Sequence, residues 1–303
     1  MLEKLSKNRQ LILKKSQEFF INSSSLIPKI GCELEFFLFS KNSEIPLNQD
    51  LVENFIFEIS EKLKEKFSLF LVIKKEHGSS QVEIETDFTA DLLKLCDEVN
   101  GMKFFVKNFA ENKNFTASFK AQPFVDDCGS ALQFNISLHG NNDENIYFID
   151  EEIVKNSASG LLSATDFMMI FLTPNQEDYL RFDFDLNRNL FKAGKFSAPV
   201  NLSFGNDNRT CAIRIPSKKN NQNQRRLEYR IASAKADPEL SISSILLAIS
   251  SGIKNKESKF EQIFGNAFDE KYSLKFFSKN LSDAEKSFLS ADNFIKKKFE
   301  EWL

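Results

Sequence analysis

The sequence lacks any apolar run long enough for a membrane span, and its N-terminus lacks the apolar segment of a secretory signal. It also has little excess charge, since its formal net charge is −3 over 303 residues. That balance argues against a general nucleic-acid coat and against a polybasic membrane binder. We therefore expect a cytoplasmic protein that has neither a nucleic acid nor a membrane as its partner.

Cysteine and glycine are also scarce. The four cysteines, Cys32, Cys96, Cys128 and Cys211, are widely spaced and form no CxxC pair. Neither a zinc site nor a disulfide framework is indicated, and a reducing compartment is expected. The 10 glycines contrast with 33 phenylalanines, which predict a core filled with Phe.

The rest of the composition is typical of a globular protein, with 42% hydrophobic and 27% charged residues. A chain of this length forms one large domain or two modest ones. No internal repeat is found, and the low-complexity stretch at 218–224 predicts a loop. We expect a single domain over 1–303, in which 1–28 form an N-terminal helix and lead-in and 256–303 form C-terminal helices.

Hydrophobic spacing predicts an α+β fold. Helices are expected at 2–20, 49–66, from an N-cap at Thr89 to about 110, at 151–172 and from Pro238 to about 254. Strands are expected at 30–40, 70–75, 81–86, 115–122, 131–139, 208–216 and 225–232. This order predicts a largely antiparallel sheet with helices on its outer side.

The segment Arg225–Arg230 carries the most informative pattern. Successive side chains of a strand point to opposite faces, so Arg226, Glu228 and Arg230 share one face while Leu227 and Tyr229 face a core. A carboxylate between two guanidinium groups could hold a metal and a phosphate side by side. An ordinary charged strand in a half-exposed sheet has the same alternation, so the segment alone leaves both interpretations open.

Carboxylates form a second pattern. Glu33 and Glu35 lie two apart in an otherwise apolar strand, and Gln81, Glu83 and Glu85 form another row on one face, with Glu76 across a turn. Carboxylates this close repel each other, and a divalent cation would relieve the repulsion. Hard oxygen ligands suit Mg²⁺ or Mn²⁺, although each row alone is equally typical of a solvated sheet face.

A series of motifs resembles, in the same order, the catalytic domain of glutamine synthetase. The matching segments are Gly31-Cys-Glu33-Leu-Glu35, Glu76-His-Gly78-Ser-Ser-Gln81-Val-Glu83, Ala117–Pro123, Gly129–Leu138, Asp178–Arg181, Ala198–Pro216, Arg226–Arg230 and the helix after Asp237-Pro238. The resemblance covers nearly the whole chain and implies the fold of that domain. It also implies a role in nitrogen metabolism through ligation of glutamate to ammonia, with ATP and Mg²⁺ or Mn²⁺ as cofactors.

The resemblance also implies roles for individual residues. Glu35, Glu76 and Glu83 would hold one metal ion, and Glu33, Gln133 and Glu228 would hold another. Phosphate-binding and catalytic arginines would be Arg209, Arg214, Arg226 and Arg230. Arg181, Gly129 and Arg214 would bind the amino-acid substrate, with Arg181 on its carboxylate.

The chain departs from the family pattern at chemical positions. Gln133 and Asn135 stand where the family has histidines, and Ser197 stands where it has the glutamate that takes a proton from ammonium. Cys128 replaces a usual polar residue, and Glu239 follows Pro238 where the family has Tyr. The chain also begins where the family's catalytic domain begins, so we expect the small β-grasp domain to be missing and any homo-oligomer to be smaller or looser than the family ring.

Three functional interpretations follow. We favour an ATP-dependent carboxylate–amine ligase, either an impaired glutamine synthetase or one that uses another amine, with small-molecule substrates. The second is a pseudoenzyme that binds nucleotide or glutamate and has a regulatory or partner role. The third is a remnant that only folds. The chain retains the glutamates that would bind metal, which argues against simple decay. Gln133 and Ser197 argue against ordinary glutamine synthesis.

Overall fold

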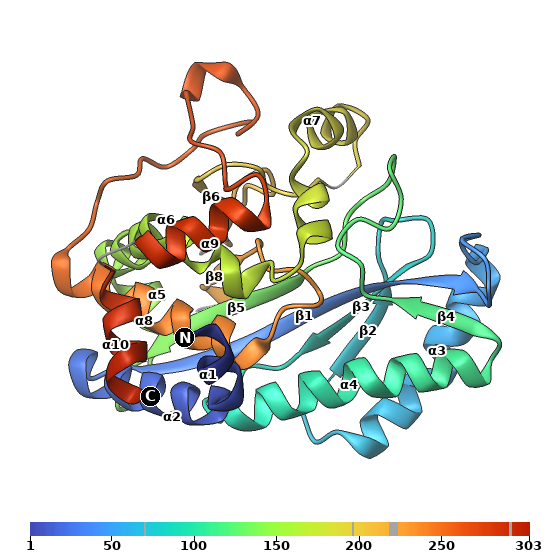
Figure 1. Cartoon of the computed structure of the whole chain (residues 1–303), viewed down its shortest axis with the longest axis horizontal. Coiled ribbons are helices and arrows are strands. Elements are labelled where there is room, and N and C mark those ends of the chain that lie inside the picture. The colour runs from blue at the N-terminus through green and yellow to red at the C-terminus, as the bar shows by residue number, and fades with distance from the viewer. Residues whose placement is uncertain (70, 196, 218–223, 291–292) are drawn as a thin grey trace.

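The computed structural model describes residues 1–69, 71–195, 197–217, 224–290 and 293–303, which form a sheet with helices packed around it (Figure 1). The strands are β1 (Ile27–Ser40), β2 (Leu71–Lys75), β3 (Gln81–Thr86), β4 (Phe115–Ser118), β5 (Leu132–His139), β6 (Phe204–Asn206), β7 (Ile213–Ile215) and β8 (Leu227–Tyr229). The longer helices are α2 (Arg9–Ser24), α3 (Gln49–Lys66), α4 (Leu92–Asn112), α6 (Glu151–Leu172) and α8 (Pro238–Asn255). Shorter ones are α1 (Leu2–Lys7), α5 (Ile146–Ile149), α7 (Phe184–Lys192), α9 (Leu281–Ser290), α10 (Phe294–Trp302) and the 3₁₀ turns η1 (Gln176–Phe182) and η3 (Glu270–Tyr272).

The strands form one eight-stranded sheet in the order β2-β3-β1-β5-β8-β7-β6, with β4 paired to the end of β1. Every pair is antiparallel except β6 with β7, which confirms the predicted largely antiparallel α+β fold. The register places Glu33 opposite both Glu85 of β3 and Gln133 of β5, and it places Glu35 opposite Glu83. The carboxylate rows predicted from the sequence are therefore neighbours on one sheet.

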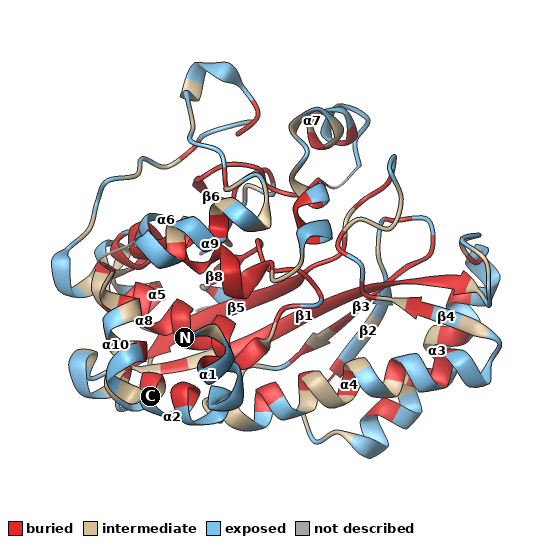
Figure 2. Ribbon diagram, viewed as in Figure 1, coloured by how far each residue is buried: buried red, intermediate tan, exposed pale blue. Residues whose placement is uncertain are grey.

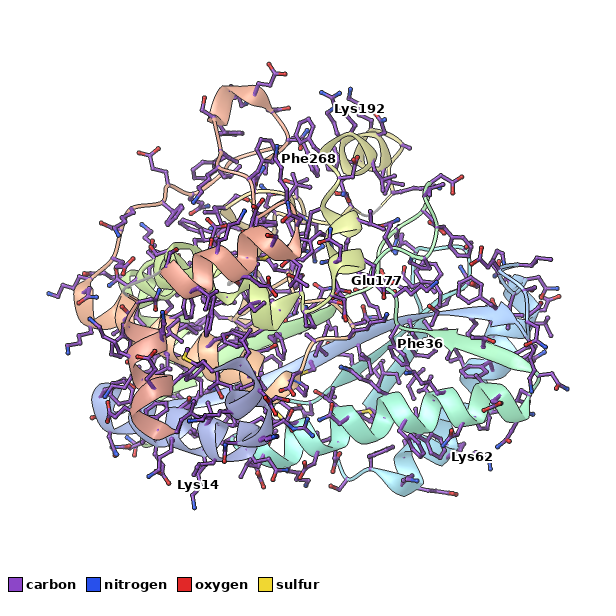
Figure 3. The ribbon with its side chains drawn as sticks, in the orientation of Figure 1. Lys14, Phe36, Lys62, Glu177, Lys192 and Phe268 are labelled. Atoms are coloured by element: carbon purple, nitrogen blue, oxygen red, sulfur yellow. The ribbon has the colours of Figure 1, made fainter. Side chains whose placement is uncertain are left out.

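Strand β1 is buried along most of its length (Figure 2). Helices α3 and α4 lie beneath the sheet in Figure 1, and Phe36 of β1 packs against Phe55 of α3 and Phe119, with ring centroids 6.4 and 5.4 Å apart. Figure 3 shows Phe36 inside the molecule while Lys14 and Lys62 point outward. One face of β1 thus builds a Phe-rich core, and the other face presents Glu33 and Glu35.

Strand β8 is fixed by the same alternation. Leu227 and Tyr229 are fully buried, and the Tyr229 hydroxyl lies 2.9 Å from Thr165 Oγ1 of α6. Helix α6 packs along α8, whose first turn is capped by Asp237 accepting a hydrogen bond from Leu240 N. The prediction for this strand is confirmed, and Glu228 is left on the opposite face.

Several predicted boundaries are wrong. The N-cap of α4 is Asp91, because the backbone of Thr89 is bridged to Ile30 of β1 and its hydroxyl accepts from Asp91 N. The N-terminal helix is divided at Asn8 into α1 and α2. Strands β4, β7 and β8 are much shorter than predicted, because turns and irregular hydrogen bonds such as Arg230 N to Ala212 O replace regular pairing.

Two further predictions, one on a loop and one on the number of domains, are not tested by the structure. Most of the loop predicted at 218–224 lies outside the described residues, as does position 70 of the predicted second strand. The assignment of the whole chain to one domain stays a prediction. Within the described residues, no helix has the length and apolar character that crossing a membrane requires.

Candidate active site

A pocket of about 510 Å³ opens over the polar face of the sheet. All residues for which the sequence predicted a role line it: Glu33, Glu35, Glu76, Glu83, Gly129, Gln133, Arg181, Arg209, Arg214, Arg226, Glu228 and Arg230. Residues from β1, β3, β5, β7 and β8 therefore meet in one cavity. Their assigned roles stay predictions, but the structure brings the predicted set together.

One end of the pocket is rich in carboxylates. Glu35 accepts hydrogen bonds from Gln133 Nε2 at 2.6 Å, from the backbone N of Ala131 at 2.9 Å and from Gln81 Nε2 at 3.2 Å. Gln81 itself is held by donating to the Gly129 carbonyl at 3.0 Å. The carboxylate of Glu35 is therefore oriented by neutral donors from β3, β5 and the loop before β5, and its charge has no direct ion pair among the described residues.

Glu83 has one basic partner at this end. Its Oε1 lies 2.8 Å from Nζ of Lys74, which also reaches Glu85 at 3.3 Å. The Glu83 side chain is buried while that of Lys74 is 46% exposed. The Lys74 ammonium is thus in contact with solvent and can move away from the carboxylate at little cost in desolvation.

The carboxylates at this end are poorly neutralised. Burial raises the pKa of Glu35 to about 7, against the opposing effects of Arg181 and Gln133. Burial, reinforced by the charges of Glu33 and Glu35, raises the pKa of Glu83 to about 9 in spite of Lys74. Burial and the charge of Glu228 likewise raise the pKa of Glu33. Such a group of carboxylates favours the arrival of a cation.

The other end of the pocket is rich in arginine. Glu228 accepts from Arg230 Nη1 on Oε1 and from Arg214 Nη1 on Oε2, both at 2.6 Å. Burial alone would raise the pKa of Glu228, but the charges of Arg230 and Arg214 lower it to about 2. This carboxylate is ionised and fully paired at neutral pH.

Two amide side chains of β5 connect the ends. Gln133 donates to Glu35 and accepts from Arg230 Nη1 at 3.0 Å. Asn135 donates to Glu33 Oε1 at 2.8 Å and accepts from Arg226 Nε at 2.6 Å. Each amide therefore lies between a carboxylate of β1 and the guanidinium group of a residue that flanks β8.

Arg181, from η1, is held mainly by the backbone. Its Nη1 and Nη2 donate to the carbonyls of Ile231 and Arg230 at 3.1 and 3.0 Å, and burial lowers its pKa to about 10. The neighbouring Gly129 has no room for a side chain, since a Cβ there would lie 2.6 Å from the Ala121 carbonyl and 2.7 Å from Arg181 Cγ. Gly129 thus allows the Arg181 side chain to pass close to the backbone.

The two groups of candidate metal ligands differ in how well they fit a divalent ion. Across the described residues, no three His, Cys, Asp or Glu side chains are already arranged as ligands of one ion. Glu35, Glu76 and Glu83 nevertheless fit such an ion chemically, because all three are hard oxygen donors and because Glu35 and Glu83 are short of positive charge. The set of Glu33, Gln133 and Glu228 does not fit, because the chain's own arginines and amides already occupy these groups.

Three further residues line the pocket without a role predicted from the sequence, namely Lys74, Lys75 and His77. The turn at Gly78 held the necessary signal, because closing the β2–β3 hairpin places Lys74 directly opposite Glu83. Ser197 and Cys128 also line the pocket and are buried. Arg225, by contrast, points away from this face and pairs with Glu151 at 2.7 Å.

Comparison with known proteins gives consistent results. Residues 45–303 match the family model described as "Glutamine synthetase, catalytic domain". The chain is 30% identical over 199 residues to gamma-glutamylputrescine synthetase PuuA of Escherichia coli (strain K12). The aligned region covers 64% of this chain and 40% of that protein. It is 30% identical over 256 residues to glutamine synthetase of Pyrococcus abyssi, which covers 79% of this chain and 55% of that protein.

The structural comparison supports the fold. The solved complex of GmaS with ADP superposes with a TM-score of 0.80 at 21% identity, over 96% of this chain and 71% of that one. GmaS without ligand gives a TM-score of 0.76, also at 21% identity. At this identity the likeness concerns the fold alone. The chain spans about half the length, or less, of the first curated relatives that it matches.

Proposed function

The chain belongs to the glutamine synthetase family, with the catalytic domain as the matching part, and from that premise we propose a specific reaction. The protein is an ATP- and divalent-metal-dependent ligase that joins a glutamate-like carboxylic acid to ammonia or another amine. The acid is activated as an acyl phosphate, and the amine then attacks its carbonyl carbon, forms the amide bond and displaces phosphate. The terminal phosphoryl group of ATP supplies the phosphate, and ADP and inorganic phosphate leave.

A single observation carries the proposal, namely that poorly neutralised carboxylates and buried arginines share one pocket. Phosphoryl transfer needs positioning and cancellation of charge more than covalent help from the protein. A carboxylate end can hold a metal–nucleotide complex, and an arginine end can hold the phosphate oxygens. This division of charge suits a ligase that starts by moving a phosphoryl group.

The residues divide into groups with separate roles. Glu35, Glu76 and Glu83 would hold the divalent ion, which when bound supplies positive charge to the phosphate oxygens. The phosphate-binding arginines would be Arg209, Arg214 and Arg226, with Arg230 acting at the reacting phosphoryl group. Arg181 and Gly129, together with Arg214, would position the amino-acid substrate.

The pocket is less well equipped to activate an amine than to bind phosphate. Ser197 is buried and lines the pocket beside Ala198, and a hydroxyl cannot act as a carboxylate base near neutral pH. The name of the Escherichia coli relative contains putrescine, so an amine other than ammonia belongs among the candidates. The presence of Ser197 in place of a carboxylate also favours the second candidate function, which is a pseudoenzyme that binds nucleotide without completing the ligation.

Two measurements test the proposal. Isothermal titration with a non-hydrolysable ATP analogue should show tighter binding in Mn²⁺ than in EDTA, and Arg226→Gln should weaken it. Arg188→Gln serves as the control, because Arg188 lies on α7 and pairs with Asp185 outside the pocket. Phosphate release should then require a glutamate-like acid. Equal binding of the analogue in EDTA and Mn²⁺ would contradict the ligase proposal, and binding without any phosphate release would favour the pseudoenzyme.

A further inference from the structure

The carboxylate of Glu228 is already paired with guanidinium groups on both of its oxygens. Each of its carboxylate oxygens accepts a charge-assisted hydrogen bond of 2.6 Å, one from Arg230 and one from Arg214, and a third guanidinium, that of Arg226, lies 3.7 Å away. The Glu228 side chain is 2% exposed and that of Arg230 is 5% exposed. An ion that bound Glu228 would have to displace a buried guanidinium, which would then lack its partner.

Gln133 is locked in the wrong orientation for a ligand. Its amide nitrogen donates to the Glu35 carboxylate at 2.6 Å, and its amide oxygen accepts from Arg230 at 3.0 Å. Turning the amide over would set its NH₂ group against a guanidinium and its oxygen against a carboxylate. Both new contacts would be repulsive, so the oxygen stays directed at Arg230.

Glu33 is held by a similar chain of contacts. Its Oε1 accepts from Asn135, whose own oxygen accepts from Arg226 at 2.6 Å. The neighbouring Glu228 has the guanidinium groups of Arg214, Arg226 and Arg230 within 2.6 to 3.7 Å. A divalent ion shared by Glu33 and Glu228 would therefore face three positive charges.

We propose that the position formed by Glu33, Gln133 and Glu228 takes no divalent ion, and that the guanidinium of Arg230 is the permanent cation there. The inference rests on the proposed function, since it concerns the same pocket, and it reduces the resident ions from two to one. Arg230 is then a positioning residue for Gln133 and Glu228 as well as a phosphate ligand. Its Nε is buried and has no hydrogen-bond partner among the described residues.

The carboxylate end differs because its internal cation can be displaced. Lys74 is 46% exposed, so an ion that takes over Glu83 releases Lys74 into water rather than into a buried, unpaired state. Glu35 is bound only by neutral donors, and its oxygens can still accept a metal. One ion at this end and none at the other is the arrangement that the contacts favour.

The first test counts bound ions with Mn²⁺ alone, by electron paramagnetic resonance titration of the whole chain. We expect one ion per chain, which is retained in Gln133→Ala and lost in Glu83→Gln. Two ions per chain, one of which disappears in Gln133→Ala or Glu228→Gln, would overturn the inference. If the unsubstituted chain binds none, the metal dependence in the proposed function fails, whereas the absence of an ion at Gln133 stands.

The second test uses stability in EDTA, which does not depend on activity. If the arginines neutralise Glu228, then Glu228→Gln should lower the melting temperature by several degrees. If Glu228 instead awaits a metal, removing its charge should leave the melting temperature unchanged or raise it, and the inference would be wrong. Glu83→Gln is the matched control, for which no decrease is expected. Should Glu228→Gln not fold, the Mn²⁺ count in the unsubstituted chain and in Gln133→Ala decides the question.

Discussion

The two ends of the pocket neutralise buried carboxylates in opposite ways. At the β1–β3 end, Glu35 and Glu83 have raised pKa values because burial and mutual repulsion exceed the help of Arg181, Gln133 and Lys74. At the β7–β8 end, the pKa of Glu228 is lowered because two guanidinium groups outweigh its burial. Glutamate carboxylates are therefore short of positive charge at the β1–β3 end, whereas the one at the β7–β8 end is fully paired with guanidinium groups.

This difference separates an exchangeable partner from a permanent one. A carboxylate whose partner is a half-exposed lysine can accept an ion from solution, since the released lysine remains hydrated. A carboxylate paired with a buried arginine cannot exchange it without leaving a charge unpaired in the interior. The pocket thus combines carboxylates whose basic partner is half-exposed with a carboxylate held by buried arginine.

The largest expected effect concerns the amine step, because Ser197 stands where the family resemblance places a carboxylate base. Ser197 lines the pocket without a carboxylate, and losing a general base typically lowers a rate by about 10²–10⁴-fold. We expect glutamate-stimulated phosphate release to exceed glutamine formation from ammonium by a comparable factor. Labelled ammonium, followed into glutamine alongside phosphate release, measures the ratio. Tightly coupled formation of one glutamine per phosphate would show that another group serves as the base.

The next effect compares the two internal cations directly. Arg230→Leu removes the buried partner of Glu228 and should lower the free energy of unfolding by about 3–5 kcal/mol. Lys74→Ala should lower it by about 1 kcal/mol or less, because the lysine is half-exposed and Glu83, with a pKa of about 9, is protonated at pH 7. Urea unfolding of both variants gives the comparison. Equal losses would mean that the two ends are held in the same way.

A third effect compares the two faces of β8. Leu227 is fully buried against the helices, so Leu227→Ala should lower the free energy of unfolding by about 2–5 kcal/mol through the cavity it leaves. The substitution is on the face away from the pocket and should leave the Mn²⁺ count unchanged. Denaturant unfolding together with an ion titration measures both quantities. A change in ion binding greater than the change in folded fraction would show that the two faces are coupled.

Much of the fold could be predicted from the sequence where hydrophobic spacing is regular. The helices at 49–66 and 151–172 have the predicted bounds, and the alternation in β8 buries Leu227 and Tyr229 as expected. The strands at 208–216 and 225–232 were predicted too long, since alternation alone does not reveal where irregular loops replace pairing. The cap at Asp91 was missed because the bridge between Thr89 and Ile30 depends on tertiary contact.

The candidate site shows the same limit. Motif order identified every residue that was assigned a role, and all of them line one pocket. What the sequence could not supply was the pairing among them. Whether Gln133 turns its oxygen to a metal or to Arg230 depends on the register of β5 with β1 and β8 and on the partners at each end of the amide. A motif indicates which side chains could bind a metal. Whether their oxygens are free to do so depends on the contacts that they make in the folded protein.

A further expected effect is a pH dependence that belongs to the carboxylate end alone. The folded pKa of Glu35, about 7, and that of Glu83, about 9, lie above the ordinary value of 4.5. The folded state therefore binds more protons than the unfolded state, so these groups stabilise the metal-free protein below about pH 4.5. They lose that contribution as pH rises through their folded pKa values.

A divalent ion binds the deprotonated carboxylates and should reverse this loss. We expect the increase in melting temperature caused by Mg²⁺ to be larger at pH 8.5 than at pH 6, on the order of 1 kcal/mol per pH unit for each proton displaced. Glu83→Gln should flatten the dependence. Glu228→Gln should leave its slope unchanged, because the pKa of Glu228, about 2, lies far below this range. Thermal melts with and without Mg²⁺ across the range measure the slopes. A dependence that persists in Glu83→Gln but disappears in Glu228→Gln would place the ion at the arginine end.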